Sequence, residues 1–165
     1  MNTNTGLFIR FETIAARQLI GLSAKMSIKE DYTAALFSQF IKSMISQNTT
    51  IPGFIYDLRI FDPAMELHPE ALFIKWAAVE KNSSNDYPSP FKDYSMPGGL
   101  YAIFLHKGPA MAAFQTFHYI FEKWLPESGL SIANRPHFDL LPKGYKPHDN
   151  NASHEIWIPV ENTEH

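Results

Sequence analysis

The chain has 165 residues, of which 45% are hydrophobic and 19% charged, so it is long enough for one domain with a well-filled core. Its net charge of −3 disfavours direct contact with nucleic acid, which requires a basic surface. The absence of cysteine excludes disulfides, thiolate catalysis and thiolate metal sites. No apolar run is long enough to span a membrane and no signal-peptide pattern is present, so we expect a cytoplasmic protein without a membrane partner.

The first half of the chain predicts a strand, a helix and two further strands. Thr13–Ile28 indicates one long strand, in which Gly21 suggests a bulge or a close approach to another backbone. Apolar pairs then recur every four residues and predict a helix with one buried stripe: Leu36/Phe37, Phe40/Ile41 and Met44/Ile45. Turn residues end this helix, and aromatic-rich strands follow at Phe54–Phe61 and Leu72–Val79.

The same order of elements is predicted for the second half, after a polar connection at Asn82–Tyr94. Gly99–Lys107 indicates a strand, and Gly108-Pro109 begins a helix that we expect Pro126 to end. The helix carries an apolar stripe expected in the core: Ala113, Phe114, Phe117, Ile120, Phe121, Trp124 and Leu125. Two more strands are predicted at Phe138–Leu141 and His154–Val160.

The two halves superpose with an offset of about 82 residues, which aligns Tyr56 with Phe138. We therefore predict a single α+β domain over 1–165, with two tandem strand–helix–strand–strand units at about 7–81 and 95–162. Such units form an antiparallel sheet with helices on one face. The seam between the halves is the expected place for a ligand groove.

Three blocks of the second half carry a more specific pattern: Gly98–Pro109 (GGLYAIFLHKGP), Trp124–Gly129 (WLPESG) and Ile156–Val160 (IWIPV). In this order and spacing they resemble the GyrI-like (gyrase-inhibitor-like) effector-binding domain. This domain is the ligand-sensing part of AraC-type and MerR-type transcription regulators, and it also occurs alone. The resemblance implies two fused units with a ligand groove between them. We expect no cofactor.

Several members of that family bind lipophilic cations through an acid at the base of the groove, usually the glutamate of a Phe-Glu-x-Tyr strand. The resemblance implies Asp139 as the matching acid, one methylene shorter, with Leu141 in place of the tyrosine. The internal offset places Asp57 at the equivalent position of the first half. The groove is therefore expected to hold two acids, although Arg59 on the same strand face is also positioned to pair with Asp57.

Aromatic residues on the predicted strands offer a stacking wall for a flat or cationic ligand, and each is equally compatible with core packing. They are Trp76, Tyr101, Phe104 and Trp157. Glu155, on the same strand face as Trp157, is a further candidate acid, or else a solvated residue at a sheet edge. The histidines show no metal-ligand spacing, so we expect no metal.

The leading hypothesis is a stand-alone effector-binding module for a small hydrophobic molecule, with a cation as one option. A first alternative is hydrolysis of strained electrophilic toxins by a groove carboxylate, with Asp139 and Glu155 as candidates. A second alternative is a protein-binding regulator of DNA gyrase. The sequence leaves a protein partner and a homodimer open.

Overall fold

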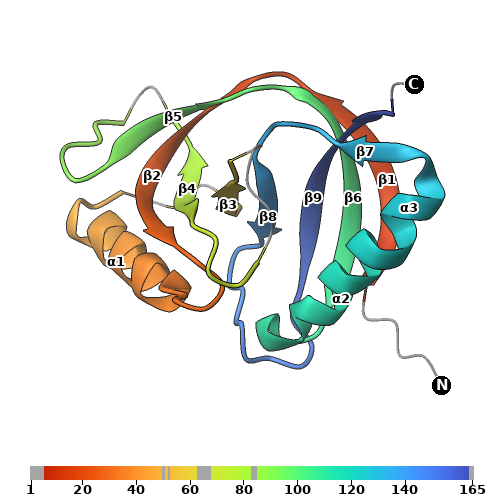
Figure 1. Cartoon of the computed structure of the whole chain (residues 1–165). Coiled ribbons are helices and arrows are strands. Elements are labelled where there is room, and N and C mark those ends of the chain that lie inside the picture. Colours follow the sequence, from red (N-terminus) through yellow and green to blue (C-terminus); the bar gives the residue numbers. More distant parts are fainter. Residues whose placement is uncertain (1–5, 50, 52, 63–67, 83–84, 164–165) are drawn as a thin grey trace.

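An arched antiparallel sheet carries the helices on one side in the computed structural model (Figure 1). The structure describes residues 6–49, 51, 53–62, 68–82 and 85–163. The strands are β1 (Gly6–Ile14), β2 (Arg17–Met26), β3 (Ile55–Ile60), β4 (Phe73–Glu80), β5 (Lys92–Met96), β6 (Gly99–Lys107), β7 (Leu130–Ile132), β8 (His137–Leu141) and β9 (Ser153–Asn162). Their order across the sheet is β1-β6-β9-β8-β3-β4-β2-β5, and the short strand β7 pairs with β9.

The two halves of the chain meet at the centre of the sheet, where β3 pairs with β8. The first half consists of β2, helix α1 (Thr33–Ser46), β3 and β4, and the second of β6, a helical segment, β8 and β9. The predicted α+β fold with two strand–helix–strand–strand units is confirmed. The outermost strands are exchanged: β1 pairs with β6 of the second half, and β5 pairs with β2 of the first.

The prediction of one long strand over Thr13–Ile28 was wrong. The chain turns at Ala15-Ala16, and the strands on either side of this turn join opposite halves of the sheet. Strand β1 was missed, as was β5, which begins inside the predicted connection at Asn82–Tyr94. Strands β1 and β5 were missed because each pairs with the distant half of the chain, which leaves little local signal. The turn at Ala15-Ala16 was missed because it lacks glycine and proline.

The helical segment of the second half is continuous from Ala110 to Ser128. It consists of η1 (Ala110–Ala112), α2 (Ala113–Tyr119), the π-helical turn η2 (Ile120–Trp124) and α3 (Leu125–Ser128). Pro126 does not end it, because the π-helical turn pairs the N–H of Leu125 with the carbonyl of Ile120 just before the proline. Gly129, with φ of 76°, ends the helix in the left-handed conformation.

The alternation of strand side chains separates two kinds of packing. On the face away from the helices, one core cluster contains Tyr56, Leu58 and Phe138. On the helix face, separate clusters lie beneath α1 and beneath α2. The residues between these positions on β3 and β8, including Asp57 and Asp139, therefore face the helix side. No helix in the described part of the chain is long and apolar enough to cross a membrane.

Gly21 permits the close approach of β2 and β4 that the sequence suggested. A Cβ atom at this position would lie 2.7 Å from the Cα of Ala78 and closer still to the carbonyl oxygen of Ala77. We predict that Gly21→Ala lowers the free energy of unfolding by about 1–3 kcal/mol, the usual cost of overpacking. Urea unfolding measures this loss.

Gly53→Ala is the matched control, because a Cβ atom there meets no described atom within 4 Å beyond its chain neighbours. Equal stability of the Gly21→Ala variant and the wild type would contradict the close-packing account.

Candidate functional site

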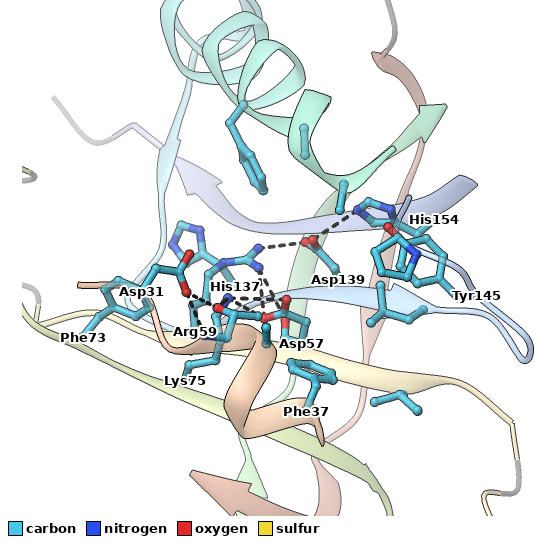
Figure 2. Close-up of a pocket in the computed structure, with 18 of the residues that line it drawn as sticks. Asp31, Phe37, Asp57, Arg59, Phe73, Lys75, His137, Asp139, Tyr145 and His154 are labelled. Atoms are coloured by element: carbon cyan, nitrogen blue, oxygen red, sulfur yellow. Dashed lines mark hydrogen bonds and ion pairs between the residues drawn. The ribbon is translucent and has the colours of Figure 1, made fainter. Parts of the chain in front are cut away.

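A large cavity lies on the helix side of the sheet, between α1 and α2 and above the central strands β3 and β8 (Figure 2). Its volume is about 1940 Å³, which exceeds the roughly 300–1,000 Å³ usual for ligand pockets. Apolar side chains of both helices form its walls: Phe37, Ile41 and Ile45 from α1, Phe114 and Phe117 from α2, and Phe121 from η2. The cavity therefore has an apolar upper part.

The floor of the cavity is polar and is built by the central strands. The sheet register places Asp57 of β3 directly opposite Asp139 of β8. Two positions along, Arg59 lies opposite both Lys75 of β4 and His137 of β8. Because residues two apart on a strand share a face, all five side chains point to the helix side.

Each carboxylate is paired with a cation of a neighbouring strand. Arg59 Nη2 donates to Asp139 Oδ1 at 2.8 Å, and Arg59 Nη1 lies 3.5 Å from Asp57 Oδ1. Lys75 Nζ lies 3.2 Å from Asp57 Oδ1. The exposed fractions of these four side chains are only 8–14%, so the network is largely shielded from water.

Opposite charges in the floor counteract the effect of burial on Asp139 and Arg59. Burial by itself would raise the pKa of Asp139, but the Arg59 charge and then the contact with His154 hold that pKa below its usual value. Burial would likewise lower the pKa of Arg59, and Asp139 and Asp57 raise it instead. Asp139 and Arg59 therefore stay charged, within a network of two acids and two bases formed by Asp57, Arg59, Lys75 and Asp139.

At the other end of the floor, His154 Nε2 lies 3.2 Å from Asp139 Oδ2 (Figure 2). His154 Nδ1 and the hydroxyl of Tyr145 are buried and have no hydrogen-bond partner among the described residues. Such atoms lose hydration without compensation and are therefore sites where a ligand can gain hydrogen bonds. No group of three or more His, Cys, Asp or Glu within the described ranges is arranged to hold a metal ion.

The floor is also attached to both helices. Lys75 Nζ donates to Thr33 Oγ1 at 2.9 Å, at the first residue of α1. The Arg59 guanidinium carbon lies 5.3 Å from the centre of the Phe117 ring on α2, a cation–π distance. The charge network thus contacts the two walls of the cavity as well as its base.

Of the residues singled out from the sequence, Asp57 and Asp139 line this cavity together. Five others do not line it. Trp76, Tyr101 and Trp157 belong to the core on the opposite face, because the pleat points them there. Phe104 is buried in the cluster beneath α2.

Glu155 is the fifth residue outside the cavity. It accepts a hydrogen bond from Trp157 Nε1 at 3.0 Å and pairs with Arg10 at 3.2 Å. These contacts belong to the face of the sheet opposite the cavity.

Sequence reasoning missed most of the floor and assigned part of the wall to the core. Phe117 and Phe121 are partly buried residues that border the cavity. The sequence analysis had placed Arg59 beside Asp57 on one strand face, and the same period-two alternation from Asp139 would have identified His137. The places of Lys75 on β4 and His154 on β9 depend on which strands pair and in what register, and the sequence pattern does not provide this.

Comparison with known proteins gives a family and a set of structural neighbours. The model for the GyrI-like small molecule binding domain matches residues 8–161. The structure of SAV2435 bound to tetraphenylphosphonium has a TM-score of 0.67 at 14% identity and covers 92% of this chain and 93% of its own. No match was found among curated proteins.

Two further solved structures share the fold. A putative bacterial transcription regulation protein from Staphylococcus aureus MU50 has a TM-score of 0.64 at 17% identity, covering 93% of this chain and 97% of its own. The EcmrR C-terminal domain has a TM-score of 0.65 at 14% identity, with the same coverage. At these identities the likeness establishes the fold alone.

His137 gives the site a measurable pH dependence. Burial, followed by the Arg59 charge, lowers its pKa to about 3 from 6.5. Between these values the unfolded chain takes up a proton that the folded chain does not, so stability falls as the pH falls, by about 2 kcal/mol at pH 5. We predict that His137→Gln shrinks the difference in unfolding free energy between pH 7.5 and pH 5 by about this amount, as measured by urea titration.

His148→Gln, which changes an exposed histidine at the cavity rim, is the control and should leave the difference unchanged. An unaltered pH dependence in the His137→Gln variant would show that folding does not lower the pKa of His137.

Proposed function

The chain belongs to the GyrI-like small-molecule-binding family, and we propose that it binds a small, largely apolar molecule in the cavity between α1 and α2. One observation carries this proposal: large apolar side chains remain exposed at the edge of the cavity. Met111 is 81% exposed, Ile45 70% and Phe114 67%, and all three line the cavity. A ligand that covered them would gain about 25 cal/mol for each Å² of apolar surface removed from water.

The polar floor supplies orientation beneath this apolar upper part. A few polar groups under apolar walls are typical of small-molecule sites, in which burial provides affinity and hydrogen bonds provide specificity. Tyr145 and His154 offer the buried polar atoms without partners described above. A structural neighbour, SAV2435, was solved bound to tetraphenylphosphonium, which supports a ligand with aromatic groups.

The sequence-based option of a cationic ligand depends on Asp57 and Asp139. Both carboxylates are already paired, so a ligand cation would have to replace Arg59 or Lys75 to reach them. We therefore define the ligand by its apolar surface, and the effect of a ligand charge is treated below.

The uncharged dye Nile red, whose fluorescence rises in apolar surroundings, is a direct probe of this proposal. We predict that it binds the wild-type protein and that Phe114→Ala weakens binding about three- to tenfold, because a wall side chain is lost. Folding should change little, since Phe114 is 67% exposed. Fluorescence titration gives the affinity and thermal denaturation checks the fold.

Phe54→Ala provides a matched control, because Phe54 is also largely exposed, at 53%, but does not line the cavity. Equal weakening by the two variants would place the dye elsewhere on the surface and contradict the assignment of the cavity.

A further inference from the structure

Arg59 occupies the position that a ligand cation would need in this cavity. Its guanidinium lies between the two acids of the floor, 2.8 Å from Asp139 and 3.5 Å from Asp57. The ring of Phe117, which lines the cavity, lies 5.3 Å above the same group. A carboxylate beneath and an aromatic ring above are the usual elements of a site for an organic cation, and here the protein's own side chain fills them.

Lys75 neutralises the second acid in a similar way. Its ammonium group contacts both oxygens of Asp57, at 3.2 and 3.4 Å, and donates to Thr33. Both carboxylates thus already have a cation of the protein beside them, and Asp57 Oδ1 has ion-pair contacts but no hydrogen bond among the described residues. Figure 2 shows the contacts of Arg59, Lys75, Asp57 and Asp139 as one connected network.

The rest of the lining has no acidic excess. In the part of the chain that the structure describes, four carboxylates and five lysine or arginine side chains line the cavity: Asp31, Asp57, Asp62, Asp139, Lys42, Arg59, Lys75, Arg135 and Lys143. Among the described residues of the lining, an organic cation therefore meets at least as much positive as negative charge.

We propose that Arg59 sets the preference of the cavity between organic cations and uncharged molecules: it acts as a built-in counter-ion that excludes organic cations. This inference rests on the proposed small-molecule function. An arriving cation must break a buried ion pair and leave a guanidinium without its partner, which is strongly unfavourable. An uncharged ligand leaves the network intact and uses the apolar walls.

Two of the buried polar atoms without hydrogen-bond partners fit an uncharged ligand. The Tyr145 hydroxyl and His154 Nδ1 are buried at the Asp139 end of the floor without partners among the described residues. Burial, followed by the charges of Asp139 and Asp57, raises the pKa of Tyr145, so its hydroxyl stays protonated and can donate a hydrogen bond. A ligand carbonyl, ether or hydroxyl group can bond there without adding a charge.

The test uses two probes of nearly equal shape, phenyltrimethylammonium and its uncharged analogue tert-butylbenzene, each competing with Nile red. For the wild-type protein we expect tert-butylbenzene to displace the dye at a concentration at least tenfold lower. For Arg59→Gln we expect the affinity for the cation to rise at least tenfold, while the affinity for the uncharged analogue changes less than threefold. Arg10→Gln is the matched control, because Arg10 pairs with Glu12 and Glu155 outside the cavity.

A second variant guards against misfolding of Arg59→Gln, which leaves two buried acids with a single lysine. The double change Arg59→Gln with Asp57→Asn removes one charge of each sign and still frees Asp139 from its arginine. The same gain in cation affinity is expected.

The outcomes separate the two proposals. If Nile red does not bind the wild-type protein, the proposed function fails and the inference fails with it. If the dye binds but the cation competes as well as its uncharged analogue, only the inference is overturned. An unchanged preference in a folded variant that lacks Arg59 overturns it too.

Discussion

The structure depends on two carboxylates, largely shielded from water, that face each other across the central strand pair. Asp57 and Asp139 are direct partners in the β3–β8 register, a position where like charges destabilise a sheet. Arg59 and Lys75, each one cross-strand diagonal away, supply the compensating charges. Lys75 also contacts Thr33 of α1, and Arg59 contacts Phe117 of α2. The ion pairs that offset the repulsion between the two acids therefore also hold the base of both cavity walls.

The same seam separates the aromatic residues into two groups with different roles. Strand aromatics such as Tyr101 and Trp157 point away from the helices and fill the core of the opposite face, where both are almost fully buried. The aromatic residues that line the cavity come from the helices, such as Phe114 and Phe117, and also from β4, where Phe73 lies two residues before Lys75. A ligand in the cavity therefore contacts helix side chains above and strand charges below, and the packed core of the opposite face stays undisturbed.

How much the sequence could predict depends on the range of the interaction concerned. The strand Gly99–Lys107 and the buried helix positions Leu36, Phe40 and Met44 follow from local periodicity and agree with the structure. Ile45 and Phe114 were predicted to be buried in the same way, and they are instead 70% and 67% exposed and line the cavity. The offset between the halves brought Asp57 and Asp139 together, although no pattern could show that they would be direct partners. Strand β1 and the position of Lys75 beside Asp57 depend on pairing between distant segments, which local propensity does not encode.

The sheet register also decides whether an acid that lies in the groove is available to a ligand. An aspartate on a strand of apolar residues suggests a functional charge, since burial without a partner is costly. Arg59, two residues beyond Asp57 on β3, reaches diagonally across to β8 and removes that cost within the protein itself. Once the charge is satisfied internally, the acid contributes to the architecture of the floor, and selectivity depends on the groups that remain unsatisfied and on the apolar walls above them.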